Sequence, residues 1–263
     1  MTSHEIDYKI YGEELQCVEV ELDPQETVVS ESGSFMMMED GIQMHTLFGD
    51  GTSQTNSFIG KLFAAGKRVI TGESLFLTAF TNEGVGKSRV TFAAPYPGKI
   101  IALNLALLGG KVVAQKDAFL CAARGVTIGI EFQRKLGTGL FGGEGFIMQK
   151  LEGDGMCFVH AGGYVVEKDL GVGETLRIDT GCIVAYTGSV NFDIEFVKGI
   201  RNVIFGGEGM FYATLLGPGK VWVQTIPISR LASRILSYAA PTNNREQGGL
   251  VGGLMDTFLK SDD

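Results

Sequence analysis

Two stretches of the chain align residue for residue: Phe141-Gly-Gly-Glu-Gly-Phe-Ile-Met-Gln-Lys-Leu-Glu-Gly-Asp-Gly-Met-Cys-Phe-Val159 and Phe205-Gly-Gly-Glu-Gly-Met-Phe-Tyr-Ala-Thr-Leu-Leu-Gly-Pro-Gly-Lys-Val-Trp-Val223. A looser third copy begins at Thr71-Gly-Glu-Ser-Leu-Phe76 and continues to Arg89-Val-Thr-Phe92. Self-similarity at a fixed spacing is typical of chains built from repeated small units. The alignment therefore predicts three repeats, with Glu73, Glu144 and Glu208 at equivalent places.

Each copy has the period of a half-buried β-strand. Phe211, Ala213 and Leu215 alternate with the residues between them, which places them on one face of a strand. Gly-Asp-Gly at 153–155 and Pro-Gly at 218–219 are typical hairpin turns. The predicted fold is mainly β: three antiparallel β-sandwich or double-stranded β-helix repeats, with a few short helices. Three glycines should lie in equivalent turns, namely Gly41, Gly125 and Gly188.

The repeats set the expected boundaries. We expect repeat 1 over residues 1–95, repeat 2 over 96–163, repeat 3 over 164–228, and a C-terminal helix and glycine-rich tail over 229–263. The first repeat is longer than the others, which predicts an inserted loop and a short helix near Phe58. Apolar residues at helical spacing predict an amphipathic helix over 228–238. The four glycines of 248–259 suggest that the tail is dispensable for folding.

Composition excludes several classes of protein. Hydrophobic residues make up 44% and charged residues 20% of 263 residues, which is typical of a folded globular chain. A net charge of −8 opposes binding to phosphate backbones, so no nucleic-acid partner is expected. The four cysteines form no C-x-x-C pair and are predicted to be buried thiols. No signal peptide is evident and no apolar run is long enough to span a bilayer, so we expect a cytoplasmic protein without a transmembrane segment.

No motif predicts catalysis, a cofactor or a metal. Gly84-Val-Gly-Lys-Ser88 resembles the end of a phosphate-binding loop, but the segment after it has the pattern of a strand and predicts a hairpin turn. Gly137-Thr-Gly-Leu-Phe-Gly142 is likewise interpreted as a turn. The strand that contains Met36-Met-Met38 should bury at least one methionine. The repeated glutamates have two interpretations: carboxylates that accept backbone hydrogen bonds at bulges, which we favour, or a ring of acids that binds a cation or a polar ligand.

The triple Gly-Glu repeat, the Glu31-Ser-Gly-Ser-Phe-Met36 segment and the predicted helix before Gly72 resemble bacterial relatives of the mitochondrial-biogenesis family named for altered inheritance of mitochondria. The resemblance covers residues 3–240. It implies a fold similar to the tryptophan RNA-binding attenuation protein, a homotrimeric ring and no catalytic residues. We therefore expect a non-enzymatic, self-assembling scaffold or binding module whose ligand the sequence does not name. The alternatives are an RNA or small-molecule binder, by analogy of fold, and a metal-dependent enzyme that uses the three glutamates.

Overall fold

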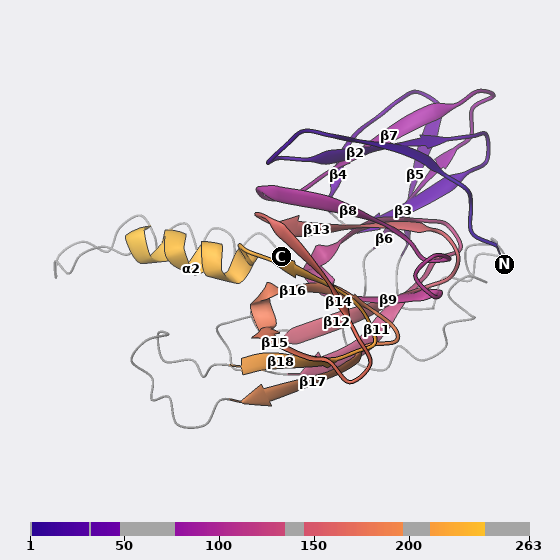
Figure 1. Ribbon diagram of the computed structural model, residues 1–263. Coiled ribbons are helices and arrows are strands. Elements are labelled where there is room, and N and C mark those ends of the chain that lie inside the picture. The colour runs from indigo at the N-terminus through magenta and orange to yellow at the C-terminus, as the bar shows by residue number, and fades with distance from the viewer. Residues whose placement is uncertain (1, 32, 48–76, 135–144, 197–210, 240–263) are drawn as a thin grey trace, which may run out of the picture. The chain divides into compact units, whose positions relative to one another are not determined.

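The computed structural model describes residues 2–31, 33–47, 77–134, 145–196 and 211–239 (Figure 1). The chain forms two compact units, Met1–Ser229 and Arg230–Asp263. The predicted helix near Phe58, the predicted turn at 137–142 and the glycine-rich tail lie outside the described residues.

The first unit is mainly β and contains four antiparallel sheets, here called A to D. Sheet A has the strand order β1 (Asp7–Tyr11), β2 (Cys17–Leu22), β7 (Ser88–Ala93) and β4 (Phe35–Met38). Sheet B has the order β5 (Ile42–Leu47), β6 (Leu77–Asn82), β3 (Thr27–Glu31), β10 (Phe119–Ala123), β13 (Met156–Gly162) and β8 (Gly98–Asn104). Sheet C has the order β11 (Thr127–Arg134), β12 (Phe146–Glu152), β9 (Lys111–Gln115), β16 (Ile183–Thr187), β19 (Gly219–Gln224) and β14 (Val165–Leu170). Sheet D has the order β15 (Thr175–Asp179), β18 (Phe211–Leu216) and β17 (Asn191–Phe196).

The sheets stack in the order A, B, C, D, with a hydrophobic core in each of the three spaces between them (Figure 1). Between A and B, the rings of Phe92 and Phe80 meet edge to face at 5.3 Å. Between B and C the core includes Val159 and Trp222. Because B and C are covered on both faces, their central strands are almost entirely buried; all five residues of β10 are buried.

Sheets B and C each contain a junction between strands that are far apart in the sequence. In sheet B, β3 pairs with β10. In sheet C, β9 pairs with β16. Each junction extends a sheet from three strands to six. Sheets A and D are the outer layers, and the structure pairs neither of them with a further sheet of the described residues.

The predicted turn glycines lie in equivalent turns. The same turn follows β4, β10 and β16, since Ile42, Val126 and Val190 each donate a backbone hydrogen bond to the residue three before. Gly41 and Gly125 occupy the third position of that turn with positive φ angles of 94° and 108°. In the third turn this position is Ser189, and Gly188 lies one residue earlier. All three glycines therefore lie in equivalent turns, as predicted, although Gly188 is one position earlier in its turn than the other two.

Four shorter predictions can be compared with the structure directly. The amphipathic helix is present as α2 (Ile228–Ala239), and among the described residues no helix combines the length and apolar character needed to cross a membrane. The hairpin between β6 and β7 contains Gly84 and Lys87, so this segment is a turn between strands and not a phosphate-binding loop. Of the four free cysteines, Cys121 and Cys157 are buried, whereas Cys17 and Cys182 are only half-buried.

Candidate functional site

The three glutamates singled out by the sequence lie outside the described residues. Glu73, Glu144 and Glu208 belong to segments 48–76, 135–144 and 197–210, so their roles stay predictions. Within the ranges that the structure does describe, no group of three or more His, Cys, Asp or Glu side chains is arranged to hold a metal ion.

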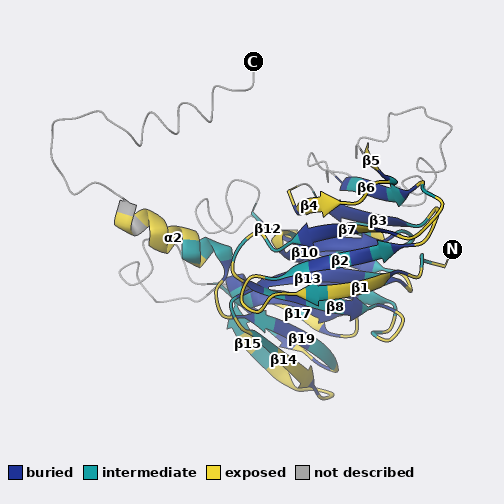
Figure 2. Ribbon diagram, turned by 90° about the horizontal axis from the view of Figure 1, so that it is seen from above, coloured by how far each residue is buried: buried dark blue, intermediate teal, exposed yellow. Residues whose placement is uncertain are grey.

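The most exposed apolar element of the described strands is β4. Its four residues, Phe35, Met36, Met37 and Met38, are 41%, 53%, 51% and 42% exposed. The prediction that at least one of these methionines is buried was therefore wrong. The physical reason is the place of β4 in the fold: it is the last strand of the outermost sheet, as Figure 2 shows by its exposed colour.

Local structure fixes β4 on one side only. It pairs with β7, and a bulge between Phe35 and Met37 shifts the register of this pair. The Phe35 ring stacks on Phe80 of sheet B at 5.3 Å, which holds the strand against the core. Met44, opposite Phe80 in the β5–β6 ladder, is 52% exposed and extends the apolar surface. On its other side, β4 has no strand partner among the described residues.

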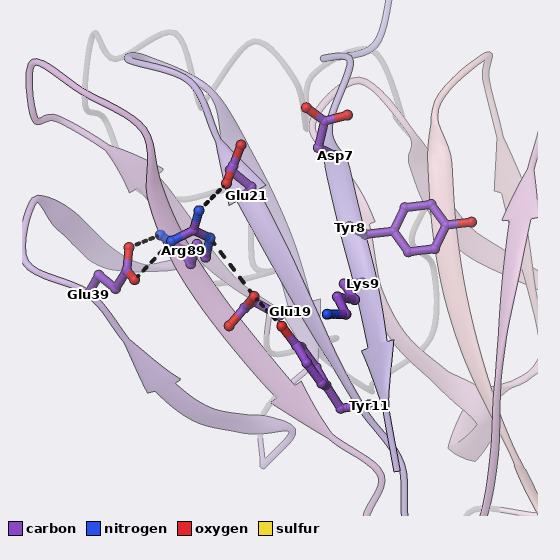
Figure 3. Close-up of a pocket in the computed structure, with 8 residues that line it drawn as sticks. All are labelled: Asp7, Tyr8, Lys9, Tyr11, Glu19, Glu21, Glu39 and Arg89. Atoms are coloured by element: carbon purple, nitrogen blue, oxygen red, sulfur yellow. Dashed lines mark hydrogen bonds and ion pairs between the residues drawn. The ribbon is translucent and has the colours of Figure 1, made fainter. Parts of the chain in front are cut away.

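Beside β4, the outer face of sheet A carries an open polar hollow of about 560 Å³ (Figure 3). Arg89 is one of the residues that line it, and Figure 3 shows its guanidinium joined to Glu19, Glu21 and Glu39. The backbone N–H of Arg89 donates to Oε2 of Glu39 at 2.9 Å. Lys87 also donates to Glu21, at 2.8 Å. These two cations lower the pKa of the Glu21 carboxyl by hydrogen bonding.

The hollow is better explained as a set of cross-strand ion pairs than as a ligand site. It is lined by two cations, Lys9 and Arg89, and by the four carboxylates of Asp7, Glu19, Glu21 and Glu39. Arg89 is already paired with three of these carboxylates. Tyr11 donates to Glu19 at 3.0 Å, so a further lining group has a partner within the protein. Exposed pairs of this kind contribute little to stability, because water and salt screen them. Their effect is to connect Glu39, at the end of β4, to β7.

A buried histidine is the feature that sequence reasoning missed. His160 on β13 is 1% exposed, and neither ring nitrogen has a hydrogen-bond partner in the part of the chain that the structure describes. The Tyr96 ring meets the imidazole edge to face at 4.3 Å. Burial lowers the pKa of His160 to about 4. The ring is therefore neutral near pH 7 and packs as part of the core.

Comparisons with known proteins agree with this architecture. Residues 8–226 match the family described as Mitochondrial biogenesis AIM24. An uncharacterized protein of Streptococcus pyogenes serotype M6, M6_Spy0233, is 29% identical over 231 residues, which is 86% of this chain and 88% of the relative. The crystal structure of protein SPYM3_0169 from Streptococcus pyogenes has a similar fold, with a TM-score of 0.69 at 23% identity, over 89% of this chain and 100% of that one. Because the family match spans most of the sequence, the chain belongs to the mitochondrial biogenesis AIM24 family.

Proposed function

We propose that this protein is a non-enzymatic, self-assembling scaffold whose assembled form is a homotrimer. The observation that carries the proposal is the exposed apolar edge strand β4. Isolated edge strands in soluble proteins are usually protected by charge, proline or a covering segment. The residues Phe35 to Met38 carry no charge, and all four are more than 40% exposed.

The apolar surface of β4 is large enough to contribute to association. Full burial of a methionine or phenylalanine side chain stabilises by about 1.5–3 kcal/mol, so covering four half-exposed side chains contributes about 1 kcal/mol for each. Association costs at least about 4 kcal/mol in lost rotational and translational freedom. Contacts beyond the side chains of β4 are therefore required, and pairing of backbone groups along the strand would supply them.

One further observation supports this proposal over ligand binding. The polar hollow of sheet A offers little free binding capacity, because Arg89 is held by three carboxylates of the protein itself. The number three comes from the family resemblance, which implies a trimeric ring. The proposal keeps the expected cytoplasmic location, which the four free cysteines support.

The direct test is to make β4 polar. A variant with Met36→Ser, Met37→Thr and Met38→Ser should sediment as a smaller species than the wild type, because it removes the apolar surface that assembly would bury. The matched control is Leu107→Ser with Val172→Thr, which changes two residues that are 83% and 90% exposed elsewhere. The control should sediment like the wild type.

Thermal unfolding of each variant at low protein concentration shows whether the monomer remains folded. If the β4 variant keeps the wild-type sedimentation coefficient, strand β4 is not an association surface. The proposal would then be wrong.

A further inference from the structure

The two inner sheets show how strands from different parts of this chain join. In the β10–β3 junction, Cys121 is opposite Ser30, Ala122 opposite Val29 and Ala123 opposite Val28. The backbone N–H of Arg124 then donates to the carbonyl of Thr27 at 3.0 Å. This junction is antiparallel, and it joins a three-stranded half of sheet B to the other half.

The second junction repeats the first. In the β16–β9 pair, Ala185 is opposite Ala114, Tyr186 opposite Val113 and Thr187 opposite Val112. The backbone N–H of Gly188 donates to the carbonyl of Lys111 at 2.9 Å, as Arg124 does to Thr27. The structure thus contains the same lateral joint twice, with the same closing hydrogen bond.

Strand β4 has the construction of β10 and β16. Each of the three pairs with the last strand of a hairpin, and each pair has a bulge at the same place: between Phe35 and Met37, between Phe119 and Cys121, and between Ile183 and Ala185. Each strand is followed by the same hydrogen-bonded turn. Met37, Met38 and Glu39 therefore correspond to Cys121, Ala122 and Ala123.

Strand β15 has the construction of β3 and β9. It pairs with β18 as β3 pairs with β6 and β9 pairs with β12. Aligning these three ladders places Leu176, Arg177 and Ile178 at the positions of Val28, Val29 and Ser30. Among the described residues, β4 lacks the neighbour that β10 and β16 have, and β15 lacks the neighbour that β3 and β9 have.

Within one copy these two edges lie apart. Sheet A and sheet D are the opposite outer layers of the compact unit, with sheets B and C between them (Figure 1). A second copy of the chain can present its β15 edge to β4 without this obstacle. The apolar residues on β15 suit this contact, because Leu176 and Ile178 are only partly buried against their core.

We propose that β4 of one copy pairs antiparallel with β15 of a second copy, with Met37 opposite Ile178, Met38 opposite Arg177 and Glu39 opposite Leu176. The pairing deepens, and rests on, the proposed self-assembly. It joins sheets D and A into one sheet in which the six strands β17, β18, β15, β4, β7 and β2 repeat the order of sheets B and C. The backbone N–H of Asp40 donates to the carbonyl of Thr175 as the closing bond. Because the two surfaces differ, the contact is head to tail and propagates until a ring closes.

The register is tested by disulfide trapping between two single variants. In the inner junctions, Thr27 and Lys111 direct their carbonyls across the joint, so alternate residues of β15 face the partner strand and Ile178 lies in a non-hydrogen-bonded pair. Such pairs have the closest Cβ atoms and suit a disulfide. Met37→Cys and Ile178→Cys proteins, mixed, refolded together and oxidised, should give a covalent dimer that reducing agent dissolves.

Controls separate register from chance contact. Each single variant oxidised alone, and the wild type with its native cysteines, should give no such dimer above background. A Met38→Cys and Ile178→Cys mixture places the thiols on opposite faces and should give much less. Equal yields from the matched and mismatched mixtures, or no dimer from the matched one while the folded proteins remain oligomeric, would overturn the pairing and leave self-assembly standing. A monomeric wild type would overturn both.

A single proline substitution on β15 gives an independent test of the strand pairing. Arg177 directs its N–H toward the open edge, so Arg177→Pro removes one donor of the joint and none of the β15–β18 ladder. Arg177→Ala is the matched control, since it removes the side chain and keeps the donor. We expect the proline variant to sediment as a folded monomer and the alanine variant to remain assembled. A proline variant that assembles like the wild type would contradict the inference.

Discussion

The buried imidazole of His160 should make the protein less stable as the pH falls from 7 to 5. Folding lowers the pKa of His160 from 6.5 to about 4, so between these values the unfolded chain binds a proton that the folded chain does not. The contribution of His160 to the free energy of unfolding is therefore fully retained above pH 6.5 and is lost as the pH falls toward 4. At 1.36 kcal/mol for each unit of pKa, the full loss is about 3 kcal/mol. Roughly 2 kcal/mol of this is lost between pH 7 and pH 5.

The assay is urea denaturation at fixed protein concentration, at pH 7 and at pH 5. His160→Gln removes the titrating group, so the variant should lose about 2 kcal/mol less than the wild type over this interval, whatever its own stability at pH 7. His45→Gln makes the same substitution at a histidine whose side chain is half exposed, and serves as the matched control. If the His160 variant and the wild type lose equal amounts, the imidazole is not held in its neutral form and the described packing around β13 is wrong.

Three further changes have defined outcomes. Gly98→Ala should destabilise the protein by about 3 kcal/mol in thermal melts, because a Cβ there would lie 1.9 Å from the Ala161 carbonyl oxygen. Gly86→Ala is the control and should change stability by less than about 0.5 kcal/mol, since nothing lies within 4 Å of a Cβ at that position. Truncation after Ala240 should leave a soluble protein with the sedimentation of the full chain, and an insoluble or monomeric product would show that the tail contributes to folding or assembly. Replacing Glu144 or Glu208 with glutamine should leave the melting temperature unchanged and alanine should cost about 1–3 kcal/mol, with no effect of a chelator; a chelator-sensitive wild type would instead support a metal site.

The class of fold could be predicted from the sequence because the outer strands have one buried face. In β18, Ala213 and Leu215 are buried and the residues beside them are less so, as the alternation predicts. The same rule fails where a strand is covered on both faces. Val221 and Trp222 are consecutive and both buried, since β19 lies in sheet C with a core on each side.

The position of each sheet in the stack could not be predicted from local pattern. Met36 to Met38 have the composition of a core strand, and the equivalent residues of β10 are buried. The methionines are exposed because sheet A has no layer outside it and β4 has no described neighbour on its open side. The available signal was positional: β10 and β16 pair with β3 and β9 of the repeat before them, whereas β4 belongs to the first predicted repeat. His160 gave no signal either, because its burial depends on the packing of Tyr96 and β8 against β13.

The mass of the full chain in solution tests self-assembly most directly. Sedimentation equilibrium at micromolar protein concentration should give about three times the chain mass of 28.2 kDa. Head-to-tail pairing of β4 with β15 leaves an open edge until a ring closes, and the family resemblance implies a ring of three chains. A single species of 28.2 kDa at that concentration would contradict both the assembly and the strand pairing proposed for it.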